Sequence, residues 1–328
     1  MILFRRYIVL VLGGVLLFFT SFEAKKIRNE KSSTYLTENV IVLVIDGPRF
    51  TETFGDTSYQ YIPHLAKDLA PQGVLVTSFW NNGPTYTNAG HTAITTGNYQ
   101  RISNVGFEHP KKPSMFQYYN KTYADLKAST YVIASKGKLN ILGNTKQKAW
   151  KNQYLPTTYC GPNGHGLGYE SDVKTWLAAK TILKEKHPKL TLINLLEVDV
   201  RGHEVNWLGY LQGIKNTDSL AFELWDFIQT DSIYRDKTTL IITNDHGRHS
   251  KGKRSGYVNH GCRCEGCKHI YLVALGPDFK KGSISKMKYE QLDISKTIAE
   301  LLQFQMPTSK GKVMWDLFEN PNLKQQSP

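Results

Sequence analysis

Three apolar runs lead into acidic residues, and this arrangement constrains the fold more than any other feature of the chain. Residues 40–45 lead into Asp46-Gly47, residues 192–198 into Asp199, and residues 240–243 into Asn244-Asp245. Short β-branched runs bounded by Gly or polar residues are typical of buried strands. Parallel strands place their carboxyl ends at one edge of a sheet, where open α/β sheets build their sites. We therefore expect the three carboxylates to meet at such an edge.

Segments with a helical pattern alternate with these runs. Helices are expected over residues 65–70, 87–94, 173–183, 218–228 and 294–302, and further strands over 74–76, 131–134 and 271–275. This alternation predicts an α/β fold, with a mostly parallel central sheet and helices on both faces. Residues from about 100 to 185 lack this alternation of strand and helix patterns. We therefore expect them to form an inserted cap over the site, except for the strand 131–134, which returns to the core. The predicted domain spans residues 39–320, and 321–328 form a tail.

The amino terminus predicts export. Arg5 and Arg6 precede residues 7–22, which carry no charge, and this pattern over residues 1–24 is typical of a secretory signal peptide or an N-terminal membrane anchor. Ala24 could occupy the last position before a cleavage site, but Phe22 would then stand where a small residue is preferred, so cleavage stays open. Residues 25–38 are polar and are interpreted as a tether. The catalytic domain is thus expected outside the cytoplasm, whether periplasmic, secreted or membrane-anchored.

The chain carries a formal net charge of +13, and 40% of its residues are hydrophobic. That apolar content excludes global disorder. A basic surface attracts anions, but the Lys residues are scattered and no basic module with interleaved aromatic residues is present, so nucleic acid is not an expected partner. A phosphorylated small-molecule substrate or an anionic membrane surface fits the charge. The sequence carries no signal for an oligomeric state.

Histidines accompany the acidic residues at short spacing. His203 follows Asp199 by four residues, His246 follows Asp245 directly, and His260-Gly261 comes shortly after. Carboxylates and imidazoles gathered at one edge of a sheet are ligands suited to Zn²⁺ or a similar divalent ion.

A Thr-containing motif, residues 84–91, lies between two expected core elements and supplies a candidate nucleophile, Thr87. A Thr hydroxyl is a weak nucleophile unless a divalent ion lowers its pKa. At the first turn of a helix it would also stand beside unpaired amides that favour an anion. The alternative is a plain helix cap. His91, one turn later, is by itself more typical of a packed or hydrogen-bonding His than of a ligand.

Taken in order, these motifs resemble the alkaline phosphatase superfamily over residues from about 40 to about 318. The resemblance is greatest to the branch of nucleotide pyrophosphatase/phosphodiesterases and Thr-nucleophile alkaline phosphatases. Its matching segments are 44–49, 84–97, 199–203, 243–247, 259–261, 275–277 and 293–302.

The resemblance implies an alkaline phosphatase-like fold with two Zn²⁺ ions. One ion would be held by Asp199, His203 and His260, and the other by Asp46, Thr87, Asp245 and His246. Thr87 would attack phosphorus and form a phosphothreonine that is then hydrolysed. Two metals roughly 4 Å apart can stabilise both the attacking and the leaving oxygen of an in-line displacement.

Three further residues are candidates for substrate contact. The resemblance places Asn104 near a phosphoryl oxygen and Lys136 and Lys138 against a doubly charged monoester, although both lysines could instead be solvated surface residues. Two cations there favour a phosphomonoesterase. The alternatives are a phosphodiesterase or pyrophosphatase acting on nucleotide or lipid head-group esters, and a non-catalytic metal-binding protein of the same fold. A sulfatase is disfavoured because no Cys or Ser followed by Pro-Ser-Arg occurs in the nucleophile region.

The four cysteines are Cys160, Cys262, Cys264 and Cys267. Export favours disulfides, and disulfides or plain thiols are the preferred interpretation. The C-x-C-x-x-C cluster could instead bind a structural metal, with Cys160 or His269 as a fourth ligand, although its spacing is tighter than the usual zinc pattern. His249 and His269 are expected to lie outside the catalytic cluster.

Overall fold

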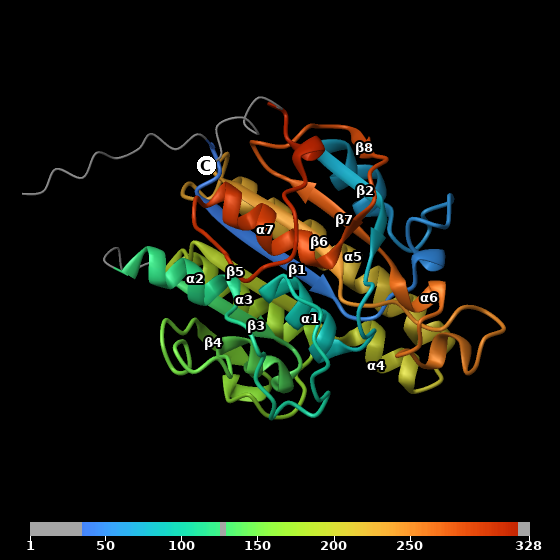
Figure 1. Cartoon of the computed structure of the whole chain (residues 1–328). Helices are drawn as coiled ribbons and strands as arrows, with labels where there is room; N and C mark the ends of the chain where they lie inside the picture. Colours follow the sequence, from blue (N-terminus) through green and yellow to red (C-terminus); the bar gives the residue numbers. More distant parts are fainter. Residues whose placement is uncertain (1–34, 125–128, 321–328) are drawn as a thin grey trace, which may run out of the picture. The chain divides into compact units, whose positions relative to one another are not determined.

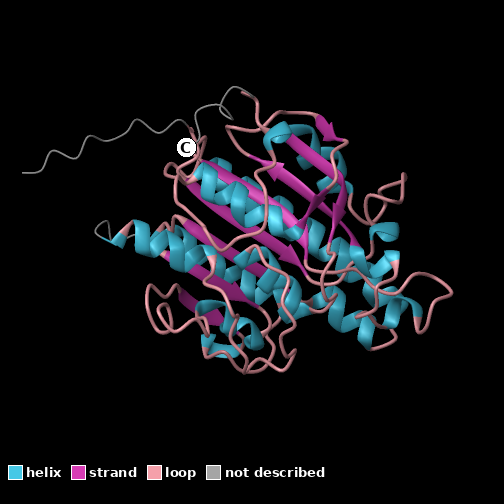
Figure 2. Cartoon of the chain, viewed as in Figure 1, coloured by secondary structure: helices cyan, strands magenta, loops and turns pink. Residues whose placement is uncertain are grey.

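The computed structural model describes residues 35–124 and 129–320, and a nine-stranded sheet runs through them (Figures 1 and 2). The strands lie in the order β4-β3-β5-β1-β6-β7-β2-β8, and β9 also pairs with β2. Their bounds are β1 Asn39–Ile45, β2 Gly73–Trp80, β3 Thr130–Ala134, β4 Thr157–Cys160, β5 Leu190–Leu195, β6 Thr238–Asn244, β7 His269–Leu275, β8 Ser283–Ser285 and β9 Tyr289–Glu290.

The sheet is mostly parallel, as predicted. The pairs β4–β3, β3–β5, β5–β1 and β1–β6 are parallel, and so are β2–β8 and β2–β9. Strand β7 runs antiparallel to both of its neighbours, β6 and β2. A parallel pair needs a long crossover, usually a helix. Residues 245–268, which join β6 to β7, contain only the short helices η7 and α6, so the chain reverses there instead.

Helices cover both faces of the sheet, which confirms the predicted fold class. Val40, Val42 and Val44 on β1 belong to an apolar cluster with α1 (Thr87–Thr96), α2 (Met115–Thr122) and α7 (Gln291–Leu301). Ile41, Leu43 and Ile45 belong to a second cluster with α3 (Asp172–Lys186) and α5 (Trp207–Thr230). The alternation follows from the period of two along a strand, and a strand buried on both faces is apolar throughout.

The remaining helical segments are short. They are α4 Glu197–His203, α6 Glu265–Lys268, η1 Phe50–Glu52, η2 His64–Leu69, η3 Ala70–Gln72, η5 Gly137–Gly143, η6 Pro162–Gly164, η7 Gly256–Val258 and η8 Trp315–Leu317. The helix expected over residues 65–70 is a π-helical turn, η2, followed by the 3-10 turn η3. Pro71 in η3 lacks the N–H that a continued α-helix would need.

The segment expected as a cap, residues 100–185, contributes more to the core than one strand. Besides β3 it supplies β4, the partner of β3 in the sheet, and the helices α2 and α3. Side chains of α2 and α3 pack in the two apolar clusters. The short strand β4 reads TTYC, and its mostly half-exposed side chains left no apolar signal in the sequence.

The predicted leader or anchor and the tail 321–328 lie outside the described residues. Of the predicted tether, only residues 35–38 are described, and they are docked rather than loose. Tyr35 is buried, and the amides of Leu36 and Thr37 donate to the carboxylate of Asp278 at 2.9 and 2.8 Å. Within residues 35–124 and 129–320, no helix combines the length and apolarity needed to cross a membrane.

Candidate metal centre

Strand ends bring the predicted acidic residues together. Asp46 directly follows β1, Asp245 directly follows β6, and Lys136 comes two residues after β3. Strands β3, β5, β1 and β6 are successive neighbours in the sheet and are parallel. Their carboxyl ends therefore share one edge, as the sequence predicted.

Asp199 reaches this edge by a different route from the one expected. The predicted strand 192–198 is wrong at its end, because β5 stops at Leu195 and Asp199 lies in the first turn of α4. The carboxylate of Asp172 accepts hydrogen bonds from the amides of Leu196 and Glu197 at 2.7 and 2.9 Å. These hydrogen bonds take the place of strand pairing where α4 starts. Asp199 lies in the first turn of α4, and its side chain is buried.

Thr87 is the first residue of α1, and its hydroxyl does not cap the helix. The capping position is Tyr86, which makes no side-chain cap bond. The amide of Asn88 instead donates to the side-chain oxygen of Asn104 at 3.0 Å. A Cβ on Gly90 would lie 2.5 Å from the carbonyl oxygen of Asp245. The missing side chain thus lets α1 approach the end of β6 closely, and this places Thr87 beside the carboxylates.

The imidazoles lie beside the carboxylates, and His246 is close to both predicted groups. His246 Nε2 lies 3.5 Å from Asp46 Oδ1 and 3.4 Å from Asp245 Oδ2. His203 Nε2 lies 3.3 Å from Asp199 Oδ1, and His260 Nε2 lies 3.5 Å from the same oxygen. The Nε2 atoms of His203 and His260 are 3.1 Å apart. Two groups of candidate ligands result, and the atoms of Asp199, His246 and His260 also lie within 4.8 Å of one another.

Lys136 joins the two groups. Its buried ammonium lies 2.8 Å from Asp46 Oδ2 and 2.6 Å from Asp199 Oδ2, and it donates to Thr87 Oγ1 at 3.2 Å. Burial alone would lower the pKa of Lys136, but the charges of Asp199, Asp46 and Asp245 raise it above its usual value. One cation therefore already balances part of the negative charge at the centre of the site.

Burial and charge leave most of the candidate ligands in the protonation state that a metal requires. Burial lowers the pKa of His246 well below its usual value and lowers that of His260 to about 4, so both rings are neutral at pH 7. Burial would raise the pKa of Asp199, but Lys136 and a hydrogen bond from His203 hold it well below its usual value. Burial and the neighbouring Asp46 raise the pKa of Asp245 to about 6.

The donor atoms fit a divalent cation. His246 Nδ1 lies 2.9 Å from the carbonyl of Gly247, and His260 Nδ1 lies 2.9 Å from the carbonyl of Thr85. Because a carbonyl only accepts, each Nδ1 carries the proton and each Nε2 keeps its lone pair for a metal. Asp46 Oδ1 and His246 Nε2 are buried and have no hydrogen-bond partner among the described residues. Oxygen and imidazole donors of this kind suit zinc.

A cavity of about 390 Å³ opens onto the centre. Its walls include Thr87, Asp199, His203 and His260 together with Asn104 and Lys138. Burial and repulsion from Lys136 lower the pKa of Lys138. The structure thus brings all three predicted substrate-contact residues to the centre: Asn104 and Lys138 line the cavity, and Lys136 contacts Thr87.

Two further residues lie at the centre, and the sequence analysis missed the first of them, Arg248. Arg248 is fully buried and its guanidinium donates to Asp199 Oδ1. His91 is buried, lies 3.3 Å from Asp245 Oδ2, and contacts the Thr87 carbonyl through the same nitrogen, Nδ1, at 2.9 Å. The sequence analysis interpreted His91, one turn after Thr87, as a packed or hydrogen-bonding residue, and these contacts agree with that interpretation. Nothing in the sequence around Arg248 distinguishes it from a surface arginine.

The cysteine cluster lies apart from this centre, and the expected fourth ligands were wrong. Cys160 is buried in the core on β4. The ring of His269 is stacked between Phe50 and Trp80. His249 is the residue that neighbours Cys262, Cys264 and Cys267, and all four cysteines are free thiols.

This fold, with carboxylates, imidazoles and a Thr hydroxyl at one sheet edge, is an alkaline phosphatase-like fold. Residues 40–260 match the family model described as type I phosphodiesterase / nucleotide pyrophosphatase. The chain belongs to this family, whose members are hydrolases that are typically metal-dependent. No curated protein matches the sequence.

Solved structures share the fold at low identity. The alkaline phosphatase PafA superposes with a TM-score of 0.65 at 11% identity, over 86% of this chain and 99% of that one. Murine ectonucleotide pyrophosphatase / phosphodiesterase 5 gives 0.60 at 17% identity, over 86% and 100%. The phosphonate monoester hydrolase SpPMH from Silicibacter pomeroyi gives 0.60 at 14%, over 89% and 78%. At these identities the likeness concerns the fold alone.

Proposed function

We propose that this protein is an exported di-zinc phosphomonoesterase that uses Thr87 as its nucleophile. The observation that carries the proposal is the position of the Thr87 hydroxyl. It stands at the start of α1, 3.2 Å from the Lys136 ammonium, in the wall of a cavity shared with Asp199, His203 and His260.

Asp199, His203 and His260 would hold one zinc ion, and Asp46, Thr87, Asp245 and His246 the other. Bound there, the two ions supply stabilisation of the attacking and leaving oxygens of an in-line displacement. The Thr87 hydroxyl gives up its proton to solvent and its oxygen bonds to phosphorus, while the bond from phosphorus to the ester oxygen breaks and that oxygen takes up a proton from solvent to leave as the alcohol. Water then cleaves the phosphothreonine, which releases phosphate and restores the hydroxyl. The amides at the start of α1 favour the phosphoryl anion throughout.

The preference for monoesters rests on Lys136 and Lys138. A monoester carries up to one more negative charge than a diester, so each nearby cation favours it through charge-assisted hydrogen bonds. Lys136 pairs with Asp46 and Asp199 in this structure. Once these carboxylates balance metal charge instead, the ammonium is available to a phosphoryl oxygen. Asn104 has its amide nitrogen to offer as a further donor, since its oxygen accepts from Asn88.

The second candidate function is a phosphodiesterase or pyrophosphatase acting on nucleotide or lipid head-group esters. The description of the matched family favours it. Steady-state rates with phenyl phosphate and with its methyl diester separate the two candidates. A higher kcat/KM for the monoester supports our proposal, and faster cleavage of the diester overturns the argument from the lysines.

A non-catalytic metal-binding protein of the same fold is the third candidate. A variant carrying both Asp199→Asn and Asp245→Asn tests it together with metal analysis. We expect the wild-type protein to hold about two more zinc ions per chain than this variant and to hydrolyse aryl phosphates. A difference of one ion or less, with no turnover by the wild-type protein, favours the binding protein.

Export is a proposal from residues 1–24 alone. The charged start and the apolar run that follows it are typical of a signal or an anchor. Fractionation of cells that express the full chain tests it. Activity released with the periplasm or medium, or found on the outer side of a membrane, supports export, and activity confined to the cytosol contradicts it.

A further inference from the structure

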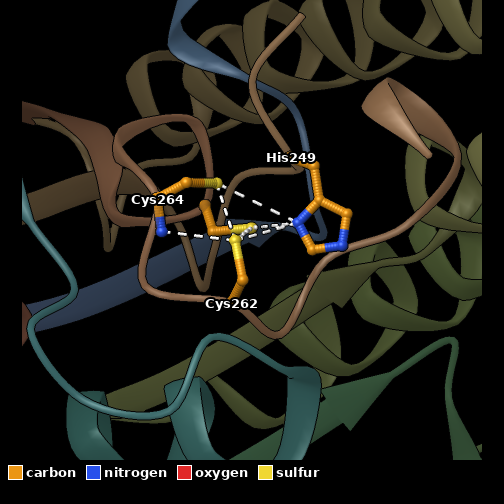
Figure 3. A group of neighbouring side chains, drawn as sticks. His249, Cys262 and Cys264 are labelled. Atoms are coloured by element: carbon orange, nitrogen blue, oxygen red, sulfur yellow. Dashed lines mark hydrogen bonds between the residues drawn. The ribbon is translucent and has the colours of Figure 1, made fainter. Parts of the chain in front are cut away.

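A second set of metal-ligand side chains gathers outside the catalytic centre. His249, Cys262, Cys264 and Cys267 each offer one ligand atom, and all of these atoms lie within 4.8 Å of one another. Figure 3 shows His249, Cys262 and Cys264 turned toward one point, with a ring nitrogen facing the sulfur atoms. We propose that these four residues bind a structural zinc ion, which fastens the loop that carries two of the catalytic ligands.

The four atoms are close enough together to share one ion, and three of their separations are shorter than those of bound zinc ligands. His249 Nδ1 lies 3.0, 3.3 and 3.9 Å from the sulfurs of Cys262, Cys267 and Cys264. The sulfur of Cys262 lies 2.7 Å from that of Cys264 and 3.6 Å from that of Cys267. Around a zinc ion with the usual bond lengths, sulfur and nitrogen ligands stand roughly 3.5–3.8 Å apart. Small shifts of the Cys262 and Cys264 side chains would complete the tetrahedron.

The chemistry of the set indicates a structural ion. Three sulfurs and one imidazole form a Cys₃His set, which occupies all four positions of a tetrahedral zinc ion and leaves none for substrate. None of these four residues lines the cavity above Thr87. The catalytic centre, by contrast, offers carboxylates and imidazoles, so the two sites differ in ligand type as well as in place.

The local backbone already supports the arrangement. The amide of Cys264 donates to the sulfur of Cys262 at 3.2 Å, and such a bond orients a ligand sulfur. Cys264 then caps the short helix α6, which carries Cys267 one turn later. Gly261 has a φ of +97°, a conformation that L side chains rarely adopt, and it turns the chain from His260 into the cysteines.

The position of the cluster gives it a role in the catalytic centre. His249 lies three residues after His246, and Cys262 lies two residues after His260. The amide of Gly247 donates to the Cys267 carbonyl at 2.9 Å, and the amide of His249 donates to the Asn259 carbonyl at 2.9 Å. A Cβ on Gly247 would lie 2.0 Å from the carbonyl oxygen of Gly266. The first and last segments of the loop, residues 247–249 and 259–267, are therefore in direct contact where the ion would cross-link them.

This cross-link would fix a connection that contains little regular structure. Residues 245–268 join antiparallel β6 to β7 with little regular structure of their own. An ion that binds only the folded form of the loop stabilises that form by mass action. Fixing His249 to Cys262 would thus fix the separation of His246 and His260, which belong to the two catalytic ligand groups.

The test measures metal in the full-length protein, purified without chelator. We expect Cys264→Ser and Cys267→Ser to hold about one zinc ion fewer per chain than the wild-type protein. Cys160→Ser, which removes the buried cysteine of β4, is the matched control and should keep the full complement. The double variant Asp199→Asn/Asp245→Asn should retain the thiolate-bound ion after losing the catalytic ones, so failure of this proposal is distinguishable from failure of the proposed function.

X-ray absorption at the zinc edge gives a readout that does not depend on activity or on the folding of a variant. The wild-type protein should show sulfur scattering at about 2.3 Å, and the Asp199→Asn/Asp245→Asn variant should show it in greater proportion. Cobalt substitution should add sulfur-to-metal charge-transfer bands that Cys264→Ser weakens. Absence of sulfur scattering in zinc-loaded wild-type protein overturns the proposal. So does a disulfide between any two of the three cysteines, detected by mass spectrometry after alkylation of the native protein.

Discussion

Arg248 and Asp199 form a buried ion pair inside the candidate metal centre. The guanidinium donates to Asp199 Oδ1, while Lys136 lies 2.6 Å from Oδ2. The other guanidinium nitrogens donate to the carbonyls of Tyr257 and Val258, so Arg248 anchors Asp199 to the loop before His260. A Cβ on Gly202 would lie 2.6 Å from the centre of the guanidinium. Because Gly202 has no side chain, there is room for the guanidinium of Arg248 beside it.

We expect Arg248→Met to weaken zinc binding at the Asp199 group by about 10- to 100-fold, because residues that orient a ligand carboxylate typically contribute this much to metal affinity. Titration against a competing chelator measures the effect. Arg201→Met is the matched control. Arg201 lies on the same helix, α4, and pairs with the partly exposed Glu204. Equal zinc affinities in the two variants would mean that Arg248 only fills space.

Thr87→Ala should abolish the chemical step and leave the fold intact. The hydroxyl is removed without a change in the backbone of α1, since Ala is favourable in a helix. We expect kcat to fall on the order of 10³-fold or more, as for loss of a nucleophile elsewhere. Thr87→Ser keeps the oxygen and should retain most of the activity. Single turnovers of an ester that carries a labelled phosphoryl group, quenched with acid, should trap a phosphoprotein in the wild-type enzyme. Near-normal turnover by Thr87→Ala removes Thr87 from the nucleophile role.

Lys138→Ala should shift the preference among esters rather than abolish activity. Lys138 lines the cavity above Thr87, and a charge-assisted hydrogen bond to the substrate contributes about 1.5–3 kcal/mol. The kcat/KM for phenyl phosphate should therefore fall by about 10- to 100-fold, and that for the methyl diester by much less. Lys174→Ala, on the exposed side of α3, serves as the control. An equal loss with both esters would contradict a role in recognising the second charge.

Removal of metal should inactivate the enzyme reversibly. The buried Asp46 Oδ1 and His246 Nε2 have no hydrogen-bond partner among the described residues, and they fit a cation. Dialysis against a strong chelator should lower kcat/KM at least about a hundredfold, and added Zn²⁺ should restore it. Metal analysis of the dialysed protein verifies that it is metal-free. Full activity in protein verified in this way would contradict a metal-dependent mechanism.

The sequence predicted the parts of this centre that follow from periodicity. Asp46 and Asp245 were placed at strand ends because the apolar run of a buried strand ends immediately before Asp46 and one residue before Asp245. Thr87 was placed because a turn and a helical pattern surround it. These are local signals, and the sheet then brings them together through the known arrangement of parallel strands.

The remaining parts depend on contacts between segments distant in sequence. The start of α4 is set by Asp172, more than twenty residues earlier, so no local pattern marks the end of β5. Arg248 is paired with a carboxylate 49 residues away. The segment 100–185 lacked a clear alternation of apolar residues because its strand β4 is the edge strand of the sheet and is half exposed. His249 lies beside the cysteines because the connection between β6 and β7 folds back on itself, with the amide of His249 bonded to the Asn259 carbonyl and that of Gly247 to the Cys267 carbonyl.

Asp172 gives the fold a pH dependence that can be measured apart from catalysis. Burial raises its pKa to about 6, despite hydrogen bonds from the amides of Leu196 and Glu197 and from the Ser135 hydroxyl. In the unfolded chain an Asp titrates near 3.9. Between about pH 4 and pH 6 the folded form therefore binds more protons than the unfolded form. The contribution of Asp172 to the free energy of unfolding is thus complete below about pH 4 and is lost as pH rises through 6.

We expect this loss to be on the order of 2–3 kcal/mol in the wild-type protein and absent in Asp172→Asn, which cannot ionise. Urea unfolding of metal-loaded protein at pH 4.5 and pH 7.5 measures this loss. At each pH the free energy of unfolding of the variant is subtracted from that of the wild-type protein, and the two differences are compared. Asp226→Asn, at an exposed position of α5, is the control and should leave the pH dependence unchanged. If Asp172→Asn shows the same pH dependence as the wild-type protein, Asp172 is already ionised in the folded state and its three hydrogen bonds outweigh its burial.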